Sequence, residues 1–182
     1  MASAFSHALV AVAMGKLSRH PVMDRRALLL GALCAVLPDI DVVGFGYGVQ
    51  YGDLWGYRGL THSLVFAALL SGALVAVWYR QRAAKVKAML CLYFFLATAS
   101  HGLLDALTNG GLGVAFLSPF DTTRYFFGFR PVAVSPIGVS EFFTAYAAQV
   151  LASEALWIWL PSTALFLSVR LLQRMRPGQP VE

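Results

Sequence analysis

Five apolar stretches separated by short polar linkers follow one another along this chain of 182 residues. They cover residues 4–17, Ala27 to Val43, His62 to Tyr79, Ala88 to Leu107, and Ser140 to about Leu172. The third stretch has about the eighteen residues that a helix rising 1.5 Å per residue needs to cross a roughly 30 Å hydrocarbon core. The pattern predicts an all-α, polytopic membrane helix bundle of about five segments.

Proline and glycine mark where these segments are interrupted. Pro38 breaks the second segment, Pro161 predicts a kink in the last, and Ser140 is a candidate N-cap for it. Residues 44–60, rich in Gly, Tyr and Trp, indicate a loop at the membrane interface. Residues 108–140 predict a long irregular outer loop, a lid or re-entrant segment with short β-like runs such as Arg124 to Phe129.

Composition supports the membrane assignment. Hydrophobic residues make up 58% of the chain and charged residues 13%, and the mean hydropathy is +0.66, which is more apolar than a soluble domain of this length. We expect one integral-membrane domain over residues 1–182, with a metal-site core at about 4–130 and a C-terminal helical region at about 140–173. Lys16 and Arg19 follow the first apolar stretch instead of preceding it, so we expect no cleaved signal peptide.

The formal charge of +5 does not point to a nucleic-acid partner, because the basic residues occur in short clusters between apolar segments. Threading five segments up and down puts three clusters on one side, which the positive-inside rule makes cytoplasmic. The N-terminus is then outside and the C-terminus inside. The clusters contain Lys16, Arg19, Arg25 and Arg26; Arg80, Arg82, Lys85 and Lys87; and Arg170, Arg174 and Arg176.

The same threading brings six candidate metal ligands together at the opposite, outer ends of the segments. His101 and Asp105 are four residues apart on one helix face, and Asp39 and Asp41 form a close carboxylate pair that would repel without a cation. Histidines and carboxylates in this number suit zinc, or manganese, and are enough for a centre of two ions. The six are His7, Asp39, Asp41, His62, His101 and Asp105.

Three further residues are candidates for catalysis of phosphoester hydrolysis. Arg58, beside the start of the third segment, and Arg124 could each bind a phosphate through the guanidinium fork. Asp121 is a candidate general acid. For Glu154 we expect a position at the rim of the bundle, with a buried proton-binding role as the alternative.

Structural interpretations of these residues stay open. His7 could be a hydrogen-bonded core histidine, and Asp39 and Asp41 could cap helix ends. A metal or proton transporter would use the same ligands, but the third and fourth segments offer few polar residues below the rim. A membrane scaffold that binds a cytoplasmic regulatory protein through the basic loops is a further alternative.

Three blocks of this sequence resemble the signature of the YdjM-like family of bacterial inner-membrane proteins. They are Leu37-Pro38-Asp39-Ile40-Asp41, Arg58-Gly59-Leu60-Thr61-His62-Ser63, and His101 to Thr108, and His7 and Ser118 to Tyr125 also fit. Members are described as membrane-bound metal-dependent hydrolases, some of them as LexA-regulated or LexA-binding. Tyr57 departs from the family pattern, which often has histidine there.

The resemblance implies a multi-pass protein of the bacterial inner membrane with a divalent metal, and together with the residues it favours a hydrolase. We expect it to act on a phosphoester of a lipid or other amphiphile at the outer face of that membrane, with membrane lipids as its surroundings.

Overall fold

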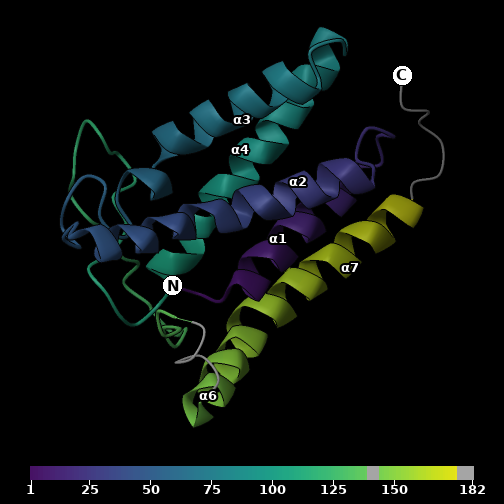
Figure 1. Ribbon diagram of the computed structural model, residues 1–182. Coiled ribbons are helices and arrows are strands. Elements are labelled where there is room, and N and C mark those ends of the chain that lie inside the picture. Colours follow the sequence, from purple (N-terminus) through teal and green to yellow (C-terminus); the bar gives the residue numbers. More distant parts are fainter. Residues whose placement is uncertain (139–143, 176–182) are drawn as a thin grey trace.

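The computed structural model describes residues 1–138 and 144–175, and these form an all-helical structure (Figure 1). This confirms the fold class predicted from the apolar stretches. Three helical runs are long and apolar enough to cross a membrane, namely Arg25–Tyr47, Ala84–Ala106 and Ala145–Met175. The α-helices are α1 (Ala4–Leu17), α2 (Arg25–Val36), α3 (Leu64–Trp78), α4 (Ala84–Ala106), α6 (Ala145–Glu154) and α7 (Leu160–Met175).

Helix α4 lies at the centre of the bundle and packs against α1, α2 and α3. Its side chains Leu90, Phe94 and Ala97 are fully buried and form the middle of the apolar core. Helix α7 lies against α1 on the other side. The apolar core therefore lies along the first part of α4, and the buried polar residues lie around its C-terminal turns.

The second apolar stretch changes from α-helix to a tighter helix at the predicted break. The Asp24 carboxylate caps α2 by accepting a hydrogen bond from the Ala27 N–H at 2.8 Å. Pro38, which has no N–H to donate, stands in the first turn of the 3₁₀ helix η1, Leu37–Tyr47. The narrower helix continues the span and carries both aspartates of the Leu37-Pro38-Asp39-Ile40-Asp41 block.

The third stretch forms a shorter helix than the sequence predicted. The Ser63 hydroxyl accepts a hydrogen bond from the Phe66 N–H at 3.0 Å and so fixes the start of α3. The 15 residues of α3 measure about 22 Å along the axis, less than a full hydrocarbon core. His62 consequently lies outside α3, in the 3₁₀ turn η2 (Leu60–His62), where its side chain can turn inward.

The C-terminal run contains a widened turn instead of a simple kink. Residues Ala155–Trp159 (η3) are π-helical, and the Leu160 N–H donates to the Ala155 carbonyl. Pro161 follows directly and cannot donate to the carbonyl four residues earlier, which explains why the regular ladder is interrupted here. Ser140, the predicted cap, lies outside the described residues.

The irregular segment before α6 contains no β-strand within the described residues. Two isolated bridges join Val114 to Tyr125 and Thr108 to Val132, so the β-like run predicted over Arg124 to Phe129 pairs at one position only. The Ala115 N–H donates to the Arg58 carbonyl, and the Leu64 N–H donates to the Phe116 carbonyl. These two hydrogen bonds join the segment to the residues before α3 and at its start. The segment covers the end of α4.

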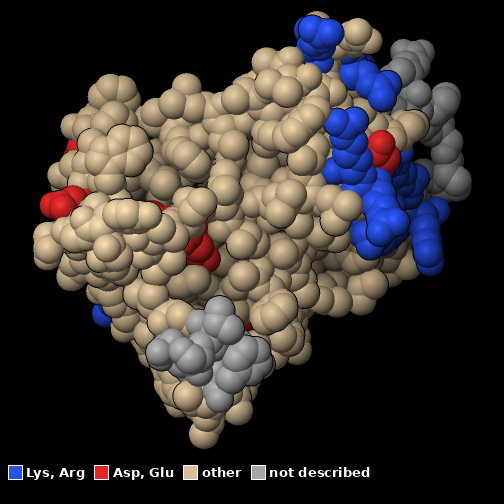
Figure 2. Space-filling view, in the orientation of Figure 1, with Lys and Arg blue, Asp and Glu red and all other residues tan. Residues whose placement is uncertain are grey.

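Charge is divided between the two ends of the bundle. Lys and Arg gather at one end, where α1, α3 and α7 finish and α2 and α4 begin (Figure 2). The N-terminus and the loops around residues 48–60 and 108–135 lie at the other end. This is the separation that the threading predicted, apart from Arg176, which lies outside the described residues.

Candidate metal centre

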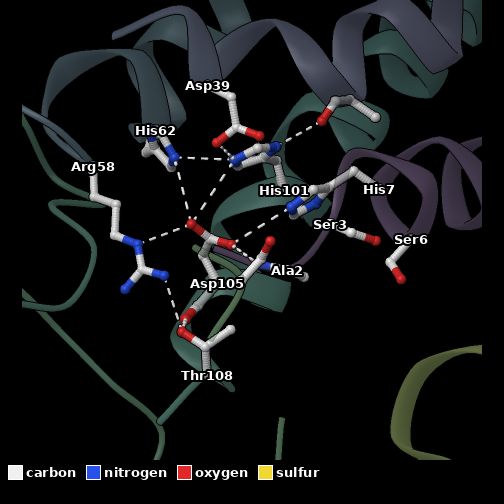
Figure 3. Close-up of polar contacts among 12 residues, drawn as sticks. Ala2, Ser3, Ser6, His7, Asp39, Arg58, His62, His101, Asp105 and Thr108 are labelled. Carbon is white, nitrogen blue, oxygen red and sulfur yellow. Dashed lines mark hydrogen bonds and ion pairs between the residues drawn. The ribbon is translucent and has the colours of Figure 1, made fainter. Parts of the chain in front are cut away.

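Four potential metal ligands converge where η1, η2 and the last turns of α4 meet (Figure 3). One ligand atom from each of Asp39, His62, His101 and Asp105 lies within 4.8 Å of the others. Asp39 comes from η1, His62 from η2, and the other two from successive turns of α4. The structure thus brings together four of the six ligands that the sequence proposed.

The distances between these atoms suit a tetrahedral ion. His62 Nε2 and His101 Nε2 are 3.0 Å apart, and His101 Nε2 is 3.3 Å from Asp39 Oδ1. Asp105 Oδ2 is 3.7 Å from the His62 Nε2 and 3.9 Å from the His101 Nε2. Tetrahedral ligands about 2.0–2.1 Å from zinc lie about 3.3–3.4 Å from each other, so the four atoms need only small movements to hold one ion.

Hydrogen bonds at the far side of each imidazole fix its orientation. His101 Nδ1 is 2.7 Å from the Ala35 carbonyl oxygen, and His62 Nδ1 is 3.1 Å from Asp41 Oδ2. Since both partners are acceptors, each Nδ1 donates, and in the neutral rings each Nε2 carries a lone pair. Two lone pairs then face each other at 3.0 Å, an arrangement that a cation between them stabilises.

Asp41 orients the site without joining the four-ligand group. Its Oδ2 accepts hydrogen bonds from the Thr61 hydroxyl at 2.7 Å and from the Arg58 N–H at 2.9 Å, besides facing the His62 ring. A carboxylate behind a ligating histidine fixes its tautomer and raises its basicity. The sequence proposed Asp41 as a ligand, and the geometry instead gives it this supporting position.

Arg58 connects Asp105 to Asp41. Its Nε donates to Asp105 Oδ2 at 2.9 Å, and its Nη1 and Nη2 donate to Gly110 O and Thr108 Oγ1 at 2.9 Å each. Its φ of 59° is the only positive value for a non-glycine residue among the described residues. Strained backbone of this kind persists where surrounding contacts hold it, and here it lets the Arg58 N–H reach Asp41.

The charge of Arg58 is kept inside the protein. Burial lowers the pKa of its guanidinium, but the Asp105 carboxylate together with Tyr57 and Tyr51 outweighs this effect and the pKa is raised. With its three nitrogens bonded to Asp105, Gly110 and Thr108, Arg58 holds Asp105 in place. The phosphate-binding role predicted for it would need one of these bonds to be exchanged.

His7 lies beside the four-ligand group. Its ring stacks on His101 with centroids 3.7 Å apart, and its Nε2 is 3.5 Å from Asp105 Oδ1. It is fully buried, and neither nitrogen has a hydrogen-bond partner. The Ala2 N–H already donates to Asp105 Oδ1 at 2.8 Å, so this side of the carboxylate is partly occupied.

Buried polar atoms without partners concentrate in this cluster. Such atoms cost free energy unless an ion or water meets them, so they support the fit of a cation to these residues. The atoms in the cluster are His7 Nδ1 and Nε2, Asp39 Oδ1 and Oδ2, and Asp41 Oδ1.

Asp39 differs from the other three members of the group. His62, His101 and Asp105 each have a partner that fixes them, whereas neither oxygen of Asp39 accepts a hydrogen bond. Its side chain is 11% exposed, while those of the other three are 0% exposed. Asp39 therefore has the fewest fixing contacts of the four and is the most exposed of them.

The remaining predicted residues lie elsewhere in the outer loops. Arg124 donates to the carbonyls of Tyr57 and Tyr51 at 2.8 Å each, so it fastens the loop over the site. Asp121 contacts Thr123 and Tyr125 of its own loop. The bond from Thr123 lowers the pKa of this carboxyl, which is opposite to what a general acid requires.

Three further residues support the site in ways that the sequence analysis did not predict. Glu154, expected at the rim, is fully buried and accepts hydrogen bonds from the Ser3 N–H and from the hydroxyls of Ser3 and Ser6. Thr61 and Thr108 bond Asp41 and Arg58. Thr61 and Thr108 lie within the Arg58-to-Ser63 and His101-to-Thr108 blocks, and this was the sequence feature that could have identified them.

Comparisons with known proteins find similarity to inner membrane proteins. The model of the YdjM inner membrane protein family matches residues 1–177. The inner membrane protein YbcI of Escherichia coli (strain K12) is 38% identical over 166 residues, covering 91% of this chain and 95% of that protein. No solved structure matches.

Proposed function

The chain belongs to the YdjM family of inner membrane proteins, and on this premise we propose that it is a membrane-bound, metal-dependent hydrolase. Its substrate is a phosphoester of a lipid or a similar amphiphile. The observation that carries the proposal is the pair of imidazole Nε2 atoms 3.0 Å apart, backed by two carboxylates and by buried polar atoms without partners.

The proposed ligands are His62, His101 and Asp105, because each is fixed from behind by another group of the protein. Zinc suits two histidines and a carboxylate best, and manganese is the second choice. A divalent ion here would supply activation of water and neutralisation of charge on phosphoryl oxygens. One ion accounts for this set, and a second would have to use His7 and the other oxygen of Asp105.

Asp39 is the proposed general base. Its oxygens lie within reach of the His101 side of the site, at 3.3 Å for the nearest pair, and neither oxygen is bonded. It can therefore accept the proton of the attacking water without first breaking a hydrogen bond. Arg58 keeps Asp105 charged and in position.

Membrane orientation completes the proposal. The positive-inside rule assigns the basic end to the cytoplasm, so the metal centre faces the outside of the inner membrane. A transporter would need polar groups continuing toward the cytoplasmic end. The described core there is formed by apolar side chains such as Val75, Leu90 and Phe94, which favours hydrolysis at one rim over transport.

The test is metal content and hydrolysis by detergent-purified protein. Wild type should hold near-stoichiometric zinc or manganese and hydrolyse bis(p-nitrophenyl) phosphate, while His62→Ala and His101→Ala should lose both. His20→Ala is the matched control, since the His20 ring lies in the linker before α2, where it accepts a hydrogen bond from the Val22 N–H. A wild type that stays metal-free after reconstitution with both ions would refute the proposal.

A further inference from the structure

An apolar groove leads along the bundle surface to the candidate metal centre. Helices α2 and α3 both pack on α4 but do not pack closely on each other, and between them lies a groove of about 510 Å³. Its walls are lined by Leu30, Leu33 and Leu37 on one side and by Leu70, Leu74 and Trp78 on the other.

Asp39 connects this groove to the site. It is the only one of the four ligand candidates that lines the groove, and also the only one whose side chain is exposed at all, at 11%. Its oxygens themselves are covered. Asp39 therefore forms the wall between the groove and the metal centre, and a turn of this unbonded side chain would join the two.

The dimensions and surroundings of the groove indicate what fills it. From Leu30 to Asp39 the helical axis advances roughly 15 Å, about half of a roughly 30 Å hydrocarbon core. In a membrane protein, a surface of exposed Leu33 and Ile40 faces lipid chains. The end of the groove at Asp39 adjoins the candidate metal centre, where a bound divalent cation would attract an anionic head group.

We propose that the groove between α2 and α3 binds the hydrocarbon chain of the substrate, with the phosphate head at the metal centre behind Asp39 and the chain running toward Trp78. The inference rests on the proposed hydrolase function and deepens it, since it makes the substrate a single-chain or splayed lipid phosphate that enters sideways from the outer leaflet. Water-soluble phosphoesters would lack this part of the binding free energy.

A second groove provides the control. Helices α1 and α7 enclose about 650 Å³ lined by Phe5, Leu9, Val12 and others, with none of the four ligand candidates among them. Lipid chains that merely surround the protein would occupy both grooves. Comparing Leu33→Trp with Leu9→Trp therefore distinguishes a substrate-binding groove from a surface that only contacts membrane lipids.

The experiment measures binding of butyl-, octyl- and dodecylphosphonate to zinc-treated protein in nanodiscs of phosphatidylcholine. For wild type we expect dodecylphosphonate to bind at least about tenfold more tightly than octylphosphonate, as more methylenes are buried. Leu33→Trp should weaken dodecylphosphonate binding about tenfold and leave butylphosphonate unchanged, whereas Leu9→Trp should behave as wild type. Leu33 is 65% exposed, and unchanged zinc content and thermal unfolding check that the variant folds.

The outcomes separate this inference from the proposed function. Equal weakening by Leu33→Trp and Leu9→Trp, or no weakening by Leu33→Trp, overturns the groove while leaving the metal centre intact. A protein that takes up no zinc yet retains the chain-length dependence and its loss in Leu33→Trp refutes the hydrolase and leaves the groove as a lipid site.

Discussion

In the proposed metal centre, Asp41 would support a ligand without itself binding the ion. It accepts hydrogen bonds from Thr61 and from the backbone of Arg58, and it faces His62 Nδ1 at 3.1 Å. An amide side chain in its place would lose the charge that favours the correct tautomer of His62. The position of the imidazole would be retained approximately, but its basicity would fall.

We therefore expect Asp41→Asn to weaken zinc affinity by about 10- to 100-fold. The measurement is competition for zinc against a chelator of known affinity. Asp121→Asn, on the surface of its own loop, should leave the affinity unchanged. If Asp41→Asn removed zinc as completely as His101→Ala, Asp41 would be a ligand after all.

For single residues, the sequence predicted membership of the site more accurately than it predicted the role of each residue. Spacing within the His101-to-Asp105 block placed two ligands on one helix face, and the structure brings them together. Spacing could not reveal that Arg58 would be enclosed and bonded to Asp105, because that contact joins residues 47 positions apart. The hydrogen bonds of Glu154 were hidden for the same reason, since its partners Ser3 and Ser6 lie at the other end of the chain.

Among the elements, close packing of α1, α2 and α4 depends on two glycines. A Cβ added to Gly31 would collide with the ring and hydroxyl of Tyr93, and one added to Gly15 would lie 2.5 Å from Leu28 Cδ2. Small residues allow membrane helices to approach closely in this way. The Tyr93 hydroxyl in turn donates to the Ala11 carbonyl at 3.2 Å, which links α4 to α1.

Gly31→Ala should therefore lower the free energy of unfolding by about 1–3 kcal/mol, the usual cost of overpacking. Gly72→Ala is the matched control, because a Cβ at Gly72 meets nothing within 4 Å and alanine favours helix. Thermal unfolding in detergent, followed by circular dichroism, would compare the two. A midpoint for Gly31→Ala equal to that of Gly72→Ala would contradict the packing argument.

Element boundaries were predictable only where local chemistry sets them. Pro38 and Pro161 both mark changes of helix type, and proline acts through its own missing N–H. The length of the third helix was overestimated because hydropathy continues past Ser63, while the cap that starts α3 depends on the geometry of that hydroxyl. Hydropathy alone therefore placed His62 inside a helix that begins two residues later.

Across the whole molecule, Glu154 joins the C-terminal helices to the N-terminal segment. It receives hydrogen bonds from Ser3 and Ser6, and the Trp159 Nε1–H donates to the Ser6 hydroxyl at 2.7 Å. The adjacent Ala2 N–H bonds Asp105 of the metal centre. The docking of α6 and the position of a metal ligand are thus connected through residues 2–6.

Removing this carboxylate should affect both stability and the site. We expect Glu154→Ala to lower the free energy of unfolding by about 2–3 kcal/mol, since several donors are left buried without an acceptor, and also to weaken zinc binding. Gln149→Ala, on the exposed face of the same helix, is the control for thermal unfolding and zinc affinity. Loss of stability with unchanged zinc affinity would show that the connection through residues 2–6 does not affect zinc binding by Asp105.

The division of charge between the two ends predicts how the molecule lies in the membrane. Three clusters of basic residues share one end, and the positive-inside rule places such clusters on the cytoplasmic side. The turn-rich loop containing Gly52 and Asp53 lies at the other end, near the metal centre. A substrate entering from the outer leaflet requires this loop to be outside.

In a background with Cys34→Ala and Cys91→Ala, a membrane-impermeant maleimide should label Asp53→Cys on intact spheroplasts. It should label Gln81→Cys, in the basic linker between α3 and α4, only after the membrane is permeabilised. Both positions are exposed, so access alone decides the result. The reverse pattern would move the centre to the cytoplasmic face, and the substrate would then have to come from the inner leaflet through the same groove.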